Sequence, residues 1–185
     1  MAIITLARIE SGAVEMEIMD VSVTDLVHQA VADIRSLAEA NGNRLTLHAD
    51  EMGVVALDAD KLSQCIAELC ANAAKFTKNG TIDVIAKRTD ARSMEMLQID
   101  VADTGIGIDE QLIAQIFQPF VQGEGRADRR FEGAGAGLAI VRALARLMGG
   151  DVSCRNRDGG GAIFTLRVPI TAPAPHLRGD LGQAA

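Results

Sequence analysis

The chain has 185 residues, of which 48% are hydrophobic and 23% are charged, a balance typical of one globular domain with a sizeable core. The formal net charge of −7 repels a phosphate backbone, and no stretch interleaves basic with aromatic residues, so these features argue against nucleic-acid binding. No apolar run is long enough to cross a bilayer and no signal-peptide cleavage site follows the first residues, so we expect no membrane insertion of this chain.

The first part of the chain predicts two helices and two short apolar strands. Residues 1–12 have the pattern of a helix end that stops at a glycine. Ser22 or Thr24 can cap the next helix, which ends at an Asn-Gly pair. A short strand begins at Leu45, and a second apolar stretch lies near Val54. The apolar stripe expected on the helix comprises Val27, Ala30, Val31, Ile34, Leu37 and Ala38.

The middle of the chain predicts a long helix, a strand pair and a short helix. Asp58 or Asp60 can open the long helix. Residues 81–89 and 93–102 alternate at period two and predict a strand pair, and residues 108–117 predict a short helix before a loop rich in Gly and Arg. The apolar side expected on the long helix comprises Leu62, Ile66, Leu69, Ala73 and Phe76.

The last part predicts one helix, two strands and a tail. The helix runs from about 136 to 148, and residues 151–156 and 162–169 alternate as strands that bury Phe164, Leu166 and Val168. Mixed elements joined by hairpins predict an α/β two-layer sandwich: one mixed, mostly antiparallel sheet of about five strands, covered on one face by about three helices. We expect residues 13–170 to form this domain and 171–185 to be a disordered tail.

Three polar side chains share one face of the long helix. Glu68 and Asn72 are four residues apart and Lys75 is three further on, which places them beside the apolar stripe. The amide oxygen of Asn72 is a hard ligand suited to Mg²⁺, and Lys75 supplies a charge that attracts phosphate. Considered alone, the same pattern is also that of an ordinary exposed polar helix face.

The strand that ends at Asp103 leads into a tight turn. Gly105 and Gly107 permit the backbone to turn and to approach a ligand closely. A carboxylate at this point can accept a hydrogen bond from the exocyclic amine of adenine, whereas guanine presents a carbonyl there. The alternative is an ordinary Asp-x-Gly transition from strand to turn.

Glycines precede the last helix. Gly133, Gly135 and Gly137 lead into a helix that begins near Leu138, where exposed amides and the helix dipole suit a triphosphate. Arg129 and Arg130 can close over the phosphates as part of a mobile lid. The glycines do not belong to a Rossmann unit, because no strand runs directly into them, and the chain has no Walker A loop.

Read together and in this order, the segments CANAAKFT, DTGIGI, IFQPF, GAGAGLAIV and LMGG resemble the N, G1, F and G2 boxes of sensor histidine kinases. These kinases share the Bergerat nucleotide-binding fold with gyrase, the ninety-kilodalton heat-shock chaperones and the mismatch-repair ATPases. The resemblance extends from about residue 20 to residue 170. It implies a two-layer sandwich that binds ATP and Mg²⁺ beneath a lid and transfers the γ-phosphoryl group to histidine.

The same resemblance implies roles for individual residues. Asn72 would coordinate Mg²⁺, Lys75 would contact the phosphates and Asp103 would recognise adenine. Around them, Gly105, Gly107 and Ile108 would shape the base pocket, Gly133, Gly135, Gly137 and Leu138 would line the phosphates, and Arg129 or Arg130 would serve the lid. Glu68 departs from the family, which often has Asn at this position. It would act either as a general base or as a residue that tunes the metal site.

Two further departures concern the lid and the phosphate acceptor. Ala134 and Ala136 replace the hydroxyl-bearing and bulkier residues usual between the glycines. The acceptor histidine of the family is followed by an acidic residue, and none of His28, His48 and His176 is. Residues 1–12 resemble the last turns of the second dimerisation helix, so we expect the acceptor upstream, on a dimerisation domain of the parent protein. A response regulator would act downstream.

Two other functions fit the same residues. An ATPase would use Glu68 to activate water, and a nucleotide-binding scaffold would keep the fold without transferring phosphate. The three cysteines, Cys65, Cys70 and Cys154, are too sparse for a disulfide framework and wrongly spaced for zinc. They suit a reducing cytoplasm, where we expect this domain, whether or not its parent is anchored in a membrane.

Overall fold

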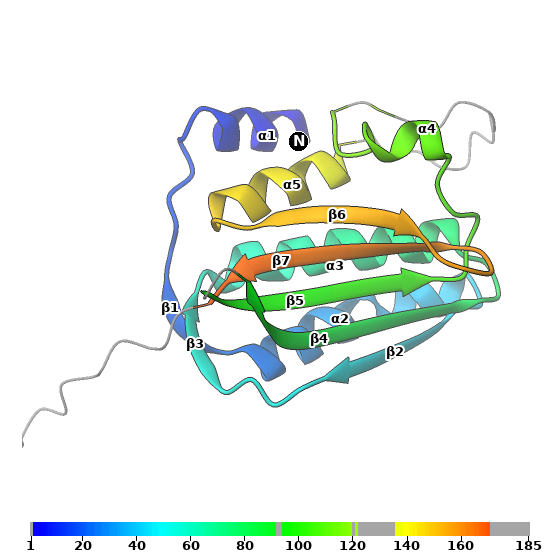
Figure 1. Cartoon of the computed structure of the whole chain (residues 1–185), viewed down its shortest axis with the longest axis horizontal. Coiled ribbons are helices and arrows are strands. Elements are labelled where there is room, and N and C mark those ends of the chain that lie inside the picture. Colours follow the sequence, from blue (N-terminus) through cyan, green and yellow to red (C-terminus); the bar gives the residue numbers. More distant parts are fainter. Residues whose placement is uncertain (1, 92–93, 120, 122–135, 171–185) are drawn as a thin grey trace, which may run out of the picture.

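A five-stranded sheet with the order β2-β4-β5-β7-β6 forms the centre of the computed structural model, which describes residues 2–91, 94–119, 121 and 136–170 (Figure 1). Strands β2 and β4 are parallel, and the other neighbours are antiparallel. The sheet is therefore mixed and mostly antiparallel, as predicted. Its strands are β2 (Arg44–Ala49), β4 (Thr81–Ala91), β5 (Met94–Asp103), β6 (Asp151–Asn156) and β7 (Ala162–Pro169).

Three helices, α2 (Val23–Ala40), α3 (Ala59–Phe76) and α5 (Gly137–Leu147), cover one face of this sheet (Figure 1). The short helix α1 (Ala2–Glu10) packs on α5, and α4 (Glu110–Ile113) follows β5. A small second sheet pairs β1 (Met19–Ser22) with β3 (Val54–Leu57). The predicted two-layer sandwich is confirmed. Among the described residues, no helix combines the length and the apolar character needed to span a membrane.

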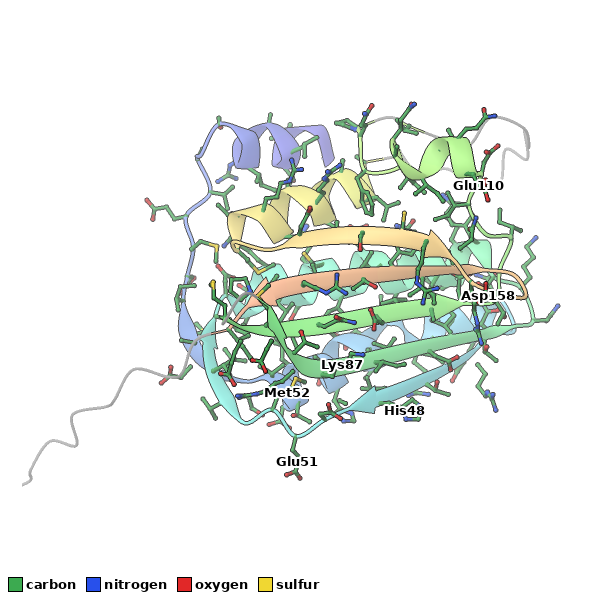
Figure 2. The ribbon with its side chains drawn as sticks, viewed as in Figure 1. His48, Glu51, Met52, Lys87, Glu110 and Asp158 are labelled. Atoms are coloured by element: carbon green, nitrogen blue, oxygen red, sulfur yellow. The ribbon has the colours of Figure 1, made fainter. Side chains whose placement is uncertain are left out.

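The core lies between the sheet and the helices. Alternate residues of β5 and β7, among them Ile99, Val101 and Leu166, are fully buried beneath α3, whose Leu62 and Ile66 are also fully buried. The other face of the sheet carries polar side chains, such as Lys87, which Figure 2 shows on the side without helices. Alternation at period two thus decides which side chains enter the core, as the strand pattern predicted.

The sequence offered two candidate caps for each of α2 and α3, and in both helices the first candidate is the cap. Ser22 caps α2 and accepts a hydrogen bond from Asp25, whereas the Thr24 hydroxyl donates to the Asp50 carbonyl. Asp58 caps α3 and accepts hydrogen bonds from the amides of Glu17 and Lys61. The carboxylate of Asp58 also pairs with the Lys61 ammonium at 2.5 Å.

Several sequence expectations were wrong in detail. Leu37 is 45% exposed, because it lies roughly 80° around the helix from Val27, at the margin of the stripe. Phe76 is 42% exposed, because α3 ends there and the buried Thr77 begins an extended segment. The helix expected at 108–117 is only the four residues of α4, followed by tighter turns. Strand β1 was not predicted. The expected tail, 171–185, lies outside the described residues.

Replacing Asp58 with Ala should lower the free energy of unfolding by about 2 kcal/mol, because α3 loses its cap and a buried ion pair loses one partner. Urea unfolding measures this difference. Asp60→Ala, an exposed acidic residue in the same turn, is the matched control and should change stability little.

The effect of Asp58 should depend on pH. Burial tends to raise the pKa of Asp58, but the Lys61 side chain and the amides of Glu17 and Lys61 outweigh it and hold the pKa below its usual 3.8. An acid whose pKa is lower in the folded chain than in the unfolded chain stabilises the fold. Its stabilisation is complete at pH values above the unfolded-state pKa and is lost as the pH falls through the folded-state pKa. The difference between parent and Asp58→Ala should therefore shrink below about pH 4; an undiminished difference in acid would contradict this explanation.

Candidate nucleotide-binding site

Asp103 lies at the end of the central strand β5 and is only 4% exposed. Its neighbours across the sheet are Ile82 of β4 and the start of β7, because Ala102 pairs with Ile163. The Oδ1 atom accepts hydrogen bonds from the amides of Gly105 at 2.8 Å and Ala162 at 3.3 Å. Both main-chain donors meet one oxygen, so the carboxylate keeps acceptor capacity for a further partner.

Asp103 is a buried acid whose charge is only partly stabilised by its neighbours. Burial raises the pKa of Asp103, and the amides of Gly105 and Ala162, the Thr77 hydroxyl and the charge of Arg157 oppose that rise without cancelling it. The Thr77 hydroxyl is fully buried beside this carboxylate and makes no hydrogen bond of good geometry within the described part of the chain. A small polar ligand at this position would meet both groups.

The turn after Asp103 packs tightly against the end of α3. A Cβ atom on Gly105 would lie 2.4 Å from the Phe76 carbonyl oxygen and 2.8 Å from the Thr77 hydroxyl, so no side chain fits there. The amide of Ile106 also points to the Phe76 carbonyl, at 3.4 Å. At Gly105 the backbone approaches the end of α3 closely, and this end of the helix lies against Asp103.

Gly107 and Ile108 continue this turn towards the hairpin between β6 and β7. Gly107 has a φ of 72°, in the left-handed region that glycine adopts readily. The side chain of Asn156, the last residue of β6, forms hydrogen bonds with both main-chain groups of Ile108. Ile108 itself packs against the core. The turn is therefore bounded by α3 on one side and by the hairpin on the other.

The predicted polar face of α3 meets the start of α5. A Cβ atom on Gly137 would lie 2.6 Å from Glu68 Oε2 and 4.0 Å from Asn72 Nδ2. Burial raises the pKa of Glu68. The structure therefore brings Gly137 against Glu68 and Asn72, which are far from it in sequence. Leu138, the next residue of α5, packs against the core.

Lys75 lies on the last turn of α3, where its ammonium is 5.2 Å from the centroid of the Phe76 ring. The lysine is half-buried and Phe76 is 42% exposed, and the main-chain carbonyl of Phe76 meets the turn after Asp103. Four predicted site residues, Arg129, Arg130, Gly133 and Gly135, lie outside the described residues.

Three residues around Asp103 were not predicted from the sequence: Thr77, Asn156 and Arg157. Thr77 follows the recognised helix, but its sequence context resembles an ordinary helix end. Asn156 and Arg157 belong to a Gly-rich hairpin that predicted only a turn. The pairing of β5 with β7 is what brings this hairpin to Asp103, and no local signal in the sequence shows that pairing.

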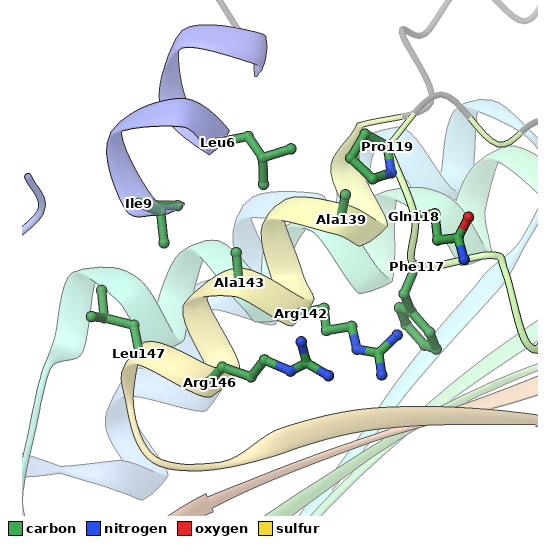
Figure 3. A pocket seen from close by; sticks show the side chains of 10 residues that line it. All are labelled: Leu6, Ile9, Phe117, Gln118, Pro119, Ala139, Arg142, Ala143, Arg146 and Leu147. Atoms are coloured by element: carbon green, nitrogen blue, oxygen red, sulfur yellow. The ribbon is translucent and has the colours of Figure 1, made fainter. Parts of the chain in front are cut away.

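A groove of about 480 Å³ lies elsewhere, between α1, α5 and residues 117–119 (Figure 3). Leu6 and Ile9 of α1 line one side, and Arg142 and Arg146 of α5 line another. None of the predicted site residues that the structure describes lines this groove, which is therefore distinct from the surroundings of Asp103.

Comparison with known proteins bears on this geometry. Residues 57–172 match the family described as histidine kinase-, DNA gyrase B- and HSP90-like ATPase. The chain belongs to this ATPase family. The match includes α3, the turn after Asp103, and α5, the three segments that form the site described above. The predicted resemblance is thereby confirmed.

The curated relatives of this ATPase domain are much longer histidine kinases. An uncharacterised sensor-like histidine kinase of Rhizobium meliloti is 33% identical over 90% of this chain, which covers 31% of that protein. The signal transduction histidine-protein kinase BarA of Escherichia coli is 31% identical over 91% of this chain, which covers 19% of BarA. The chain thus spans less than a third of the length of either relative.

Solved structures agree with this assignment. The crystal structure of full-length ShkA in complex with AMPPNP matches 94% of this chain and 36% of the ShkA chain, with a TM-score of 0.81 and 30% identity. The mycobacterial sensor histidine kinase MprB matches 86% of this chain and all of the MprB chain, with a TM-score of 0.69. At 20% identity, MprB supports the fold alone.

Replacing Asp103 with Asn should leave the ATPase domain at least as stable as the parent near neutral pH. Because burial raises the pKa of Asp103 above 3.8, ionising it costs more in the folded than in the unfolded chain. Ionisation of Asp103 therefore destabilises the fold. This loss of stability is absent below pH 3.8 and reaches its full size above the pKa of Asp103 in the folded chain. Asn cannot ionise, so the substitution removes the loss. Chemical unfolding near neutral pH and in acid measures the difference. A marked loss of stability at neutral pH would mean that the carboxylate holds the fold together.

Proposed function

We propose that this chain is the ATP-binding catalytic domain of a two-component sensor histidine kinase. It binds Mg-ATP and transfers the γ-phosphoryl group to a histidine on a separate dimerisation domain. The observation that carries this proposal is the buried carboxylate of Asp103, which ends a central strand and is surrounded by Thr77, Gly105 and the hairpin after β6. The histidine kinase relatives and the AMPPNP complex of ShkA support it.

The base end of the pocket fits adenine. A carboxylate accepts a hydrogen bond from the exocyclic amine of adenine but opposes the carbonyl that guanine presents there. The Thr77 hydroxyl, buried beside this carboxylate, offers a second polar contact. These groups account for selection of one purine.

The phosphate end lies further along α3. Asn72 offers an amide oxygen to Mg²⁺, Gly137 allows the start of α5 to come close, and Lys75 contributes positive charge. The described residues contain no cluster of three or more His, Cys, Asp or Glu side chains that could hold a metal alone. Mg²⁺ usually binds one or two protein ligands together with substrate phosphates and water, so Asn72 would hold it jointly with the nucleotide.

The reaction requires positioning more than covalent chemistry on the protein. A nitrogen of the acceptor imidazole would form a bond to the γ-phosphorus as the bond to the β,γ-bridging oxygen breaks. ADP would leave with that electron pair, and the displaced proton of the imidazole would pass to solvent. His28 and His48 are exposed and lie on α2 and β2, and neither has the sequence context of an acceptor. The acceptor would therefore come from the dimerisation domain.

Helix α1 supports this arrangement of partners. We infer that residues 1–12 are the end of a dimerisation helix and that residues 13–170 form the catalytic domain. Leu6 and Ile9 are buried against the groove on α5, so this segment packs on the same helix that begins at Gly137. A response regulator would receive the phosphoryl group downstream. The free thiols of Cys65, Cys70 and Cys154 suit a reducing cytoplasm.

Replacing Asp103 with Asn should weaken binding of a non-hydrolysable ATP analogue by about tenfold or more, because an amide replaces an acceptor that reads the base. Isothermal titration calorimetry with Mg²⁺ measures the affinity. Asp100→Asn, an acidic residue on the polar face of the same strand, is the control and should bind normally. Equal affinity of the parent and Asp103→Asn would count against the proposal.

A transfer assay should separate the kinase from an ATPase and from a scaffold. Incubated with labelled ATP and a dimerisation domain that contains the acceptor histidine, the chain should label that domain in an acid-labile form. Glu68 favours the ATPase as a second candidate, because burial raises its pKa and it lies beside Gly137. Steady phosphate release without acceptor that is abolished in Glu68→Gln would support that function instead. Binding without either product would indicate a scaffold.

A further inference from the structure

Asn156 binds the main chain of the turn after Asp103 in the manner of a neighbouring strand. The Ile108 amide donates to Asn156 Oδ1 at 2.8 Å, and Asn156 Nδ2 donates to the Ile108 carbonyl at 2.7 Å. One carboxamide thus satisfies both main-chain groups of Ile108. Asn156 is part-buried and lies at the end of β6, so its own backbone is held by the sheet.

The segment that Asn156 holds is otherwise irregular. Residues 104–109 belong to no helix or strand, and Gly107 within them has a left-handed φ of 72°. Asn156 Oδ1 lies 3.2 Å from the position of a Cβ atom on Gly107. At its other end the segment is anchored by Asp103 and the Phe76 carbonyl. Without Asn156, the second half of this turn would lose its main side-chain partner.

The hairpin that carries Asn156 is itself fixed against Asp103. The Arg157 amide donates to the Gly161 carbonyl at 2.9 Å, which closes the hairpin. A Cβ atom on Gly161 would lie 1.9 Å from the Asp103 carbonyl oxygen, so the two backbones are in direct contact. Asn156 therefore links the turn to the same structural unit that supplies the Ala162 amide to Asp103.

From this geometry we propose that Asn156 is a positioning residue for nucleotide binding. Its carboxamide holds residues 105–108 in the conformation that forms the base pocket. This inference rests on the proposed function, because it assumes that a base occupies the pocket beside Asp103. Asn156 contacts the turn and acts on the ligand through it.

The expected loss of nucleotide affinity depends on how often residues 105–108 adopt the conformation that can bind the base. When a binding-competent conformation is only partly populated, the apparent affinity falls by that fraction. The loss of two hydrogen bonds on a short irregular segment is sufficient to reduce this population about tenfold. A purely structural role would instead lower the stability of the whole domain and leave the affinity of the folded fraction unchanged.

The test compares Asn156→Ala and Asn156→Asp with the parent in the full chain. Calorimetry with a non-hydrolysable ATP analogue and Mg²⁺ should show affinity about tenfold weaker in both variants. Asn156→Asp keeps the volume and the acceptor for the Ile108 amide but places an oxygen opposite the Ile108 carbonyl. Hydrogen exchange in the free protein should be faster at the Ile108 amide in Asn156→Ala, with exchange in β5 unchanged.

Thr165→Val is the matched control, because it removes a 2.6 Å hydrogen bond to Asp100 on the polar face of the sheet. It should bind the analogue like the parent. If both Asn156 variants bind the analogue as tightly as the unchanged chain, the inference is overturned and the proposed function stands. The same holds if their loss of affinity is no larger than that of Thr165→Val. A parent chain that does not bind the analogue would overturn the proposed function, and this inference with it. If Asn156→Ala does not fold, Asn156→Asp decides.

Discussion

The pair of hydrogen bonds from Gly105 and Ala162 to Asp103 is the interaction on which the candidate site depends. It places a carboxylate inside the fold, where a charge is costly unless it is compensated. The amides compensate it only in part, since burial still raises the pKa of Asp103. The two bonds also join three segments, the end of β5, the following turn and the start of β7. The carboxylate that we propose to read the base is thus also the point at which these three segments meet.

Helix α3 serves both ends of the site. Its last residues and Thr77 lie against the turn after Asp103, and Glu68 and Asn72 lie against Gly137. Nine residues separate Glu68 from Thr77, or about 14 Å along the helix axis, a length suited to an extended nucleoside triphosphate. The opposite side of α3 is fully buried, with Leu62, Ile66 and Leu69 in the core. Because packing fixes the helix, the spacing between the proposed base end and the proposed phosphate end is fixed as well.

The sequence predicted the fold class, most element positions and the family, because hydrophobic periodicity and the order of the motifs are properties of the chain itself. The predicted burial was wrong for Leu37 and Phe76, because their exposure depends on how the helices pack in the folded chain. The grouping of Glu68 and Asn72 was readable from helical spacing, but their contact with Gly137 was not. Asn156 illustrates the remaining gap, because its partner, Ile108, is 48 residues away and is reached only through the order of strands in the sheet.

The strand order also determines when during folding the pocket can form. Strand β7 is the last strand in sequence, yet it lies inside the sheet between β5 and β6. The contact between Asp103 and Ala162 joins residues 59 positions apart, so the loop that links them must close before the carboxylate gains its second amide. On a ribosome, a chain that has emerged only as far as α5 would already contain Asp103, α3 and Gly137. It would lack β7 and the hairpin that lies against the turn, so the surroundings of Asp103 are completed only after nearly the whole domain has been synthesised.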